Sequence, residues 1–370
     1  MSTWTAIETL RSWVQLESPS QSAECVSRMA DAVAAHVAGT PIAVERVPGR
    51  EGLGDWIILR AGPQSDQPPL LVLSHLDTVH PLGTVQNGLP FRVEGDRIYG
   101  PGIYDMKGGM LIGIEALKSV ASRGTASRPI IYLCTPDEEI GSPTSRQQIV
   151  SFGQIAEAVL VTEPARDGGK VVTARKGMGL FEMRVTGRAA HAGMRHGDGR
   201  NAIAEAARLV LAIEAMSDPG LGITTNVGMI SGGTAANTVP EVCYFPIDVR
   251  FESPEGGNRI CDAISALKAS SADFAVEIKG GEDRPAYDYS PEGQALFKTA
   301  RRLAKEIGLD LEATTRTGGV SDGNLTATLG TPTLDGLGVD GEGAHTLHEH
   351  AYASSFEPRQ TLLTRLMETL

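Results

Sequence analysis

The sequence predicts an α/β fold that is interrupted by an inserted domain of different, α+β architecture. Three short apolar runs, residues 69–74, 129–134 and 156–161, are typical of strands buried on both faces of a sheet. A helical pattern over 107–122, closed by Gly124, separates the first two runs, and such alternation favours an α/β sheet. At 370 residues the chain is also longer than one hydrophobic core usually supports, so two domains are expected.

The segments on either side of these runs complete the predicted order of elements. Before the first run, helical periodicity predicts helices over 4–15 and 22–38. After the third run, residues 179–185 alternate between apolar and polar side chains, as in a strand with one exposed face. A helix, two strands, a helix and a strand are then predicted at 201–216, 223–230, 241–251, 256–270 and 274–279. A helix over 291–307, ended by Gly308, resumes the α/β pattern.

This order predicts the domain boundaries. Residues 1–176 and 287–370 form the α/β domain, and residues 177–286 form the insert. Four antiparallel strands with two helices packed on one face account for the insert.

Composition and charge exclude several classes of protein. No apolar run approaches eighteen residues and the N-terminal residues lack the pattern of a signal peptide, so we expect neither a membrane span nor export. The formal net charge of −12 opposes nucleic-acid binding, which needs a cationic surface. The 4 cysteines are widely spaced without a C-x-x-C pair, which fits buried thiols in a reducing cytoplasm.

Ionisable residues follow each of the three buried runs at once. His75 and Asp77 follow the first run, residues 137–139 (Asp-Glu-Glu) the second, and Glu163 the third. Because open α/β sheets bind ligands at the carboxyl ends of their strands, this edge is a candidate site. A hydrogen-bonded pair at a strand end and a solvated run of charges are the alternative explanations for the first two groups.

The residue types in these groups favour a metal site. In an extended segment His75 and Asp77 face the same way, and a carboxylate can orient a metal-bound imidazole. The glycine-rich turn 100–109 lacks a phosphate-loop motif, and its Asp105 would repel phosphate. With His345 near the C-terminus, these residues form a mixed nitrogen and oxygen set that suits Zn²⁺, with Co²⁺ or Mn²⁺ as alternatives.

Together these motifs resemble the aminoacylase/glutamate-carboxypeptidase family of dinuclear zinc hydrolases. The resemblance spans nearly the whole chain and is carried, in order, by residues 74–79, 100–109, 137–142, 163–164, 191–193 and His345. It is closest to the folate-hydrolysing glutamate carboxypeptidases, through residues 91–96 leading into the glycine-rich turn. It implies a mixed-sheet zinc-peptidase catalytic domain with an inserted lid and dimerisation domain.

The resemblance implies two Zn²⁺ ions held by five side chains. Asp105 would bridge the two ions, His75 and Glu163 would complete one site, and Glu139 and His345 would complete the other.

It also implies the roles of neighbouring residues. Asp77 would orient His75, and Glu138 would act as the general base and later as the acid. His191, supplied by the insert of the partner subunit in a homodimer, would stabilise the tetrahedral oxyanion. In the family the peptide bond after the bridging aspartate is cis, so we expect a cis bond before Met106, where folate-type enzymes often carry a second aspartate.

Further positions match substrate-binding residues of the family. Arg250 and Asn237 match positions that hold the substrate carboxylate, and Lys170 and Arg284 match cations of the glutamate-specific members. Ordinary surface charge is the alternative for each cation. The loop predicted to close over the substrate consists of Thr317, Gly318 and Gly319.

These roles predict a function. We expect hydrolysis of an amide bond that releases a C-terminal acidic residue, glutamate, from a small N-acyl amino acid or peptide substrate. Family aminopeptidases usually carry aspartate at the position of Glu163, which favours carboxypeptidase or deacylase action. A deacylase of the acetylornithine or succinyl-diaminopimelate type is the alternative among hydrolases. A catalytically silent binding protein is the alternative from another class, although Glu138 and Asp105 are both present.

Four other histidines receive no role. We expect surface positions for His80, His196, His348 and His350.

Overall fold

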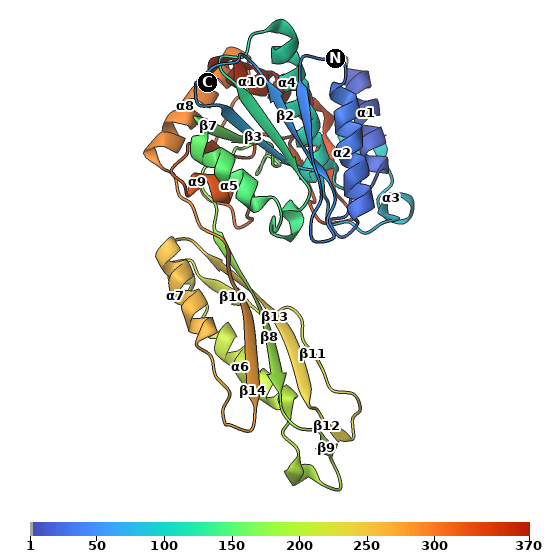
Figure 1. Cartoon of the computed structure of the whole chain (residues 1–370), viewed down its shortest axis with the longest axis vertical. Helices are drawn as coiled ribbons and strands as arrows, with labels where there is room; N and C mark the ends of the chain where they lie inside the picture. The colour runs from blue at the N-terminus through green and yellow to red at the C-terminus, as the bar shows by residue number, and fades with distance from the viewer. Residues whose placement is uncertain (1–2) are drawn as a thin grey trace. The chain divides into compact units, whose positions relative to one another are not determined.

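The structure, a computed structural model, describes residues 3–370 and divides into two units (Figure 1). Unit 1 contains the described residues up to Ala174, together with Tyr289–Thr317 and Ser321–Leu370. Unit 2 contains Arg175–Asp288 and Gly318–Val320. Each unit buries its own hydrophobic cluster, so each has the core expected of a domain.

The main sheet of unit 1 has six strands in the order β1-β2-β6-β3-β7-β15. These strands are β1 (Ala43–Val47), β2 (Trp56–Ala61), β3 (Leu70–His75), β6 (Ile130–Thr135), β7 (Ala158–Val161) and β15 (Thr333–Leu334). Strand β3 is parallel to β6 and β7, and β15 is parallel to β7, whereas β2 runs antiparallel to β6 and β1. The sheet is therefore mixed, which confirms the predicted fold class.

The three predicted apolar runs form the centre of this sheet. Every residue of β3, β6 and β7 is buried, because helices and loops cover both faces. In the register His75 lies opposite Thr135 and Leu73 opposite Val161, so the three strands end at one edge. The residues that follow them, including Glu139 and Glu163, therefore start from neighbouring positions.

Helices surround the sheet of unit 1 in Figure 1. They are α1 (Thr3–Gln15), α2 (Ala23–Val37), α3 (Thr84–Asn87), α4 (Gly108–Arg123), α5 (Arg146–Ile155), α8 (Pro291–Glu306), α9 (Gly323–Ala327) and α10 (Phe356–Thr369). Helix α4 ends at Gly124 in the left-handed region, as predicted. Its start needs glycine, because a Cβ on Gly109 would lie 2.0 Å from the carbonyl oxygen of Thr162.

A second, smaller sheet of unit 1 has the order β16-β17-β5-β4. Its strands are β4 (Arg92–Glu94), β5 (Arg97–Tyr99), β16 (Gly341–Glu342) and β17 (His350–Tyr352). Because β17 pairs with β5 so that His350 lies opposite Tyr99, the residue before β17 is brought beside the glycine-rich turn after β5.

Unit 2 is an antiparallel sheet with two helices. Its elements are β8 (Gly177–Thr186), β9 (Ala190–His191), α6 (Ala202–Glu214), β10 (Thr224–Asn226), β11 (Ser231–Gly232), β12 (Thr238–Val239), β13 (Val242–Phe251), α7 (Pro254–Ser265) and β14 (Ala275–Arg284). Four strands follow the order β10-β13-β8-β14, and the short β11 also pairs with β13. Burial alternates along β8 and β13, and Figure 1 shows α6 and α7 beside this sheet. The predicted architecture of the insert is confirmed.

Two smaller observations complete the fold. All four cysteines are buried and free, as predicted. Within residues 3–370, no helix combines the length and the apolar character needed to cross a membrane.

Candidate metal centre

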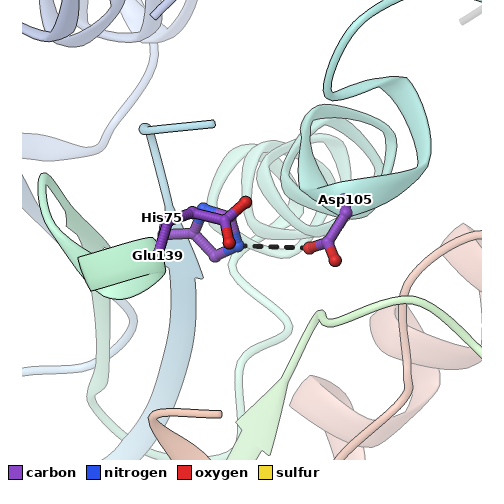
Figure 2. A group of neighbouring side chains, drawn as sticks. All are labelled: His75, Asp105 and Glu139. Atoms are coloured by element: carbon purple, nitrogen blue, oxygen red, sulfur yellow. Dashed lines mark hydrogen bonds and ion pairs between the residues drawn. The ribbon is translucent and has the colours of Figure 1, made fainter. Parts of the chain in front are cut away.

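The last residue of β3, His75, is the buried centre of a cluster of carboxylates. Its side chain is 1% exposed, and its Nε2 lies 3.3 Å from Oδ1 of Asp105 and 3.5 Å from Oε1 of Glu163. Figure 2 shows His75 beside Asp105 and Glu139. The strand end thus presents one imidazole nitrogen to carboxylates that come from two other segments of the chain.

The second oxygen of Asp105 faces the other predicted histidine. Nε2 of His345 lies 3.5 Å from Oδ2 of Asp105 and 3.3 Å from Oε2 of Glu139. Asp105 therefore lies between two imidazoles, and each imidazole also contacts a different glutamate. The structure brings all five residues of the expected ligand set into one cluster.

The positions and bonding of the donor atoms fit a metal ion. Two groups have ligand atoms that all lie within 4.8 Å of one another, His75 with Asp105 and Glu139, and His75 with Glu138 and Glu163. Oε1 of Glu139 is buried and receives no hydrogen bond from any residue within 3–370. A buried carboxylate oxygen without a donor is costly unless a cation contacts it, so the residues fit a metal.

The ionisation of the histidines shows how negative the cluster is. Burial alone would lower the pKa of His75, but hydrogen bonds to Asp105 and other carboxylates raise it well above 6.5. Hydrogen bonds with Asp105 and Glu139 raise the pKa of His345 to about 11. Burial opposes ionisation of Asp105, yet hydrogen bonds with His345 and His75 hold its pKa below the usual range. The carboxylates of the cluster therefore favour the protonated, positively charged forms of His75 and His345.

In contrast to Asp105, the two adjacent glutamates have pKa values above the usual range. Burial raises the pKa of Glu139 to about 7, against the effect of its hydrogen bond with His345. Burial, followed by the charge of Glu163, raises the pKa of Glu138 well above 4.5. Divalent cations would relieve this crowding of carboxylates, which is the second reason that the set fits a metal.

Asp77 holds the segment that carries these glutamates. Its Oδ1 and Oδ2 accept the backbone N–H groups of Glu138 (3.1 Å) and Glu139 (3.2 Å). Nδ1 of His75 lies 2.9 Å from the main-chain carbonyl oxygen of Asp77 but 3.5 Å from its carboxylate. The carboxylate thus orients the glutamates directly, and the carbonyl is the nearer partner of the imidazole.

Ser20 is a member of this arrangement that sequence patterns do not indicate. Its hydroxyl donates to Oδ2 of Asp77 at 2.6 Å, and the serine is 4% exposed. It lies 57 residues from Asp77 in the chain, and no local spacing links the two.

Asp137, the first of the three adjacent carboxylates, has a structural role. Its oxygens accept hydrogen bonds from the backbone and hydroxyl groups of Thr144 and Ser145, before α5. Only Glu138 and Glu139 of this run are left to face His75.

The glycine-rich turn gives Asp105 its position. The peptide bond between Asp105 and Met106 is cis, as the resemblance implied. Gly102 has φ +70°, and a Cβ there would lie 2.4 Å from the Cγ2 atom of Thr78, so only glycine fits.

The expectation of surface positions is wrong for two histidines. His80 and His350 are each only 6% exposed, whereas His196 and His348 are exposed. His80 is buried because Nε2 pairs with Oε2 of Glu349 at 2.6 Å. The ring of His350 packs against two tyrosines of the small sheet.

The predicted oxyanion donor and one substrate ligand meet in unit 2. Strand β9 pairs with β12 so that His191 lies opposite Thr238, and the backbone N–H of Ala192 donates to Asn237 O at 2.9 Å. Both His191 and Asn237 are exposed.

Arg250 has a partner that the sequence did not suggest. Its Nε and Nη2 donate to the two oxygens of Asp248 at 2.9 and 2.8 Å. Asp248 therefore already occupies a pair of guanidinium donors that could bind a carboxylate through two parallel hydrogen bonds.

The other predicted substrate residues are distributed over both units. In unit 1, Lys170 pairs with Glu312 at 3.4 Å. In unit 2, Arg284 is 1% exposed and contacts Asp283. In the predicted closing loop, the Thr317 N–H donates to Ala174 O within unit 1, whereas Gly318 O and Gly319 O accept from Arg250 and Arg175 within unit 2.

Known proteins share both the sequence pattern and the fold. The profile of peptidase family M20/M25/M40 matches residues 71–369. The chain is 31% identical to carboxypeptidase G2 of Pseudomonas sp. (strain RS-16), over 98% of this chain and 89% of that protein. It is 27% identical to succinyl-diaminopimelate desuccinylase of Ralstonia nicotianae, over 85% of each. Its fold is similar to an M20 family metallo-carboxypeptidase of Sulfolobus solfataricus, with a TM-score of 0.72 and 16% identity over 100% of this chain and 99% of the other.

Proposed function

Because the chain belongs to peptidase family M20/M25/M40 and is therefore a hydrolase of peptides or acylated amino acids, we propose that it releases a C-terminal glutamate from N-acyl or peptide-like substrates. We propose that two Zn²⁺ ions serve this reaction, with Co²⁺ or Mn²⁺ as alternatives. One observation carries the proposal. The two oxygens of Asp105 face two different histidines, and each histidine contacts its own glutamate.

Five side chains would hold the metal pair. In this proposal Asp105 would be a ligand shared by both ions, His75 and Glu163 would hold one, and Glu139 and His345 would hold the other. The buried, donor-free Oε1 of Glu139 supports this assignment. When bound, the ions would polarise the scissile carbonyl and make the attacking water more acidic.

The remaining residues of the cluster would move the proton. Glu138 would take a proton from the attacking water and deliver one to the leaving nitrogen. Its position supports this role. Asp77 accepts a hydrogen bond from the backbone N–H of Glu138, and the carboxylate of Glu138 lies close to the side chains of His75 and Glu163. Ser20 fixes Asp77 in turn, so the base is held by a chain of two hydrogen bonds.

We propose that unit 1 is the catalytic domain and unit 2 the lid and dimerisation domain. His191 of a partner subunit would then donate to the oxyanion. Arg250 and Asn237 would hold the substrate carboxylate, and Arg284 and Lys170 would add positive charge. Because Asp248 already occupies the Arg250 guanidinium, the substrate would have to compete for it.

A substrate panel on metal-loaded protein tests this function. N-acyl-glutamate, folate, N-acetylornithine and N-succinyl-diaminopimelate are assayed side by side after metal analysis. We expect the highest kcat/KM on a substrate that releases glutamate, and loss of turnover after exhaustive chelation with recovery on adding Zn²⁺. Activity confined to the last two substrates would establish the deacylase alternative instead, for which the similarity to the desuccinylase is the supporting observation. Undiminished turnover after chelation would contradict the metal mechanism.

A further inference from the structure

A buried glutamate outside the ligand set binds the backbone of the turn that carries Asp105. Glu349 is 1% exposed, and its Oε1 accepts the N–H groups of Tyr104 (2.9 Å) and Asp105 (3.0 Å). Its Oε2 accepts the N–H of Gly102 at 3.0 Å. One carboxylate therefore ties down three backbone donors within four residues, including that of Asp105 itself.

The fourth contact of Glu349 comes from His80. Nε2 of His80 lies 2.6 Å from Oε2, and in the tautomer that carries its proton on Nε2 the imidazole donates to this carboxylate. The pair bridges 269 residues of sequence and is buried at both ends. With this contact each carboxylate oxygen receives two hydrogen bonds, which fills its accepting capacity.

The small sheet explains why Glu349 lies at the turn. Since His350 of β17 is opposite Tyr99 of β5, Glu349 falls opposite the first residue of the turn after β5. The same segment contains His345, whose Nε2 contacts Asp105 Oδ2. The connection between β16 and β17 thus contacts Asp105 at two points. Glu349 accepts a hydrogen bond from its backbone N–H, and His345 contacts its carboxylate.

From this geometry we propose that Glu349 is a positioning residue of the metal centre, oriented by His80. By fixing the N–H groups of residues 102–105, it sets the direction in which the Asp105 carboxylate points between His75 and His345. This inference rests on the proposed role of Asp105 as the ligand shared by two metal ions. Groups that orient metal ligands typically change metal affinity or activity by roughly 10–100-fold when removed.

The substitution Glu349→Gln tests the proposal with little change in volume. Gln keeps one accepting oxygen but turns an NH₂ group toward backbone donors, so the turn loses part of its support. We expect Zn²⁺ affinity, measured by competition with a chromophoric chelator, to weaken by roughly 10–100-fold. The kcat should fall by a similar factor, whereas KM should stay within about twofold, because Glu349 directs a ligand and not the substrate.

A matched control lies elsewhere in unit 1. Glu115 of α4 is also buried and also pairs with a histidine, His36, at 2.6 Å, but neither belongs to the cluster. Glu115→Gln should lower the melting temperature while leaving Zn²⁺ affinity and kcat unchanged. If Glu349→Gln behaves like Glu115→Gln, with wild-type affinity and kcat, Glu349 is merely structural and the inference is overturned.

Substitutions of His80 keep the test decisive if Glu349→Gln fails to fold. His80→Gln retains an N–H donor for Glu349, whereas His80→Leu removes it. We expect His80→Leu to weaken Zn²⁺ affinity by about tenfold and His80→Gln to restore most of it. Equal, wild-type affinity in both would also overturn the inference. Failure of the wild-type protein itself to bind Zn²⁺, Co²⁺ or Mn²⁺ would instead contradict the proposed function, so the two failures are distinguishable.

Discussion

The two halves of the proposed metal centre are built on very different supports. His75 and Glu163 have side chains only 1% and 5% exposed, and His75 ends a central strand that is paired on both sides. In the other half Glu139 is 6% exposed but His345 is 53% exposed, on a loop between two short strands and with φ +64°. One half is pre-formed within the domain core, and the other is completed by a solvent-accessible side chain. The halves should therefore differ in how they hold a cation and what they contribute to catalysis.

The largest expected effect tests whether the buried half does more than bind metal. Glu138 groups with His75 and Glu163, so it could serve as a base or as a further ligand. For Glu138→Gln we expect kcat to fall by about 10²–10⁴, with two metal ions retained by elemental analysis. Asp137→Asn, the adjacent carboxylate that binds Thr144 and Ser145, is the control for simple loss of charge. Loss of one ion from Glu138→Gln would mean that Glu138 is a ligand.

The second prediction concerns the difference in exposure between the halves. Because His345 is open to solvent, a chelator should remove the ion of its half first, giving two phases of release. His345→Ala should abolish the faster phase and His75→Ala the slower one, with about a tenfold or larger loss of affinity in the affected half. The measurement is metal release followed with a chromophoric chelator. A single phase in the wild-type protein would contradict the distinction.

A smaller effect is expected from the support behind the buried half. Ser20→Ala removes the hydroxyl that binds Asp77, so the segment carrying Glu138 and Glu139 should be held less firmly. We expect kcat to fall by about tenfold with KM nearly unchanged. Ser18→Ala is the matched control, because the buried Ser18 hydroxyl donates instead to the carbonyl of Leu76. Equal effects of the two substitutions would show that only loop packing matters.

The smallest expected effect is on the pH dependence of stability, at a buried glutamate that lies outside the proposed metal centre. Although burial opposes it, hydrogen bonds with His36 and Lys118 lower the pKa of Glu115 below 4.5. A carboxyl whose pKa is lowered on folding stabilises the protein above its unfolded pKa and loses this contribution as the pH falls through the folded value. Glu115→Gln should therefore reduce the free energy of unfolding by about 1 kcal/mol at pH 7. The difference from wild type in chemical denaturation should shrink below about pH 4.5; a constant difference down to pH 3 would contradict the assignment.

The sequence predicted those parts of the fold in which local pattern and burial agree. The three apolar runs became β3, β6 and β7, because a strand buried on both faces has to be continuously apolar. Strand β2 was not predicted, although its residues 56–59 form a buried apolar run of the same kind, and β1 was not predicted either. Four of the five residues of β1 are exposed, so the strand is held by its pairing with β2 and shows no buried face. Their antiparallel pairing is what makes the sheet mixed, which the resemblance implied but periodicity did not.

In the candidate site, residues beside strand ends could be predicted and their supports could not. His75 ends a buried strand, and Glu139 and Glu163 follow two others, so their meeting at one edge follows from strand order. Ser20 and Glu349 act over separations of 57 and 244–269 residues, which no local motif encodes. The only sequence signal for Glu349 is its place four residues after His345, in a segment of clustered histidines. The sequence predicts a surface position for His80, because an isolated histidine gives no hint of a distant carboxylate.

The order of the site residues along the chain has a consequence for biosynthesis. Of the proposed ligands and base, all but His345 are already present when translation has passed residue 163. A growing polypeptide thus holds every residue of the deeply buried half before the insert has been made. His345 and Glu349 are added only after the insert, so a product terminated before them would lack both a proposed ligand and the proposed anchor of the Asp105 turn.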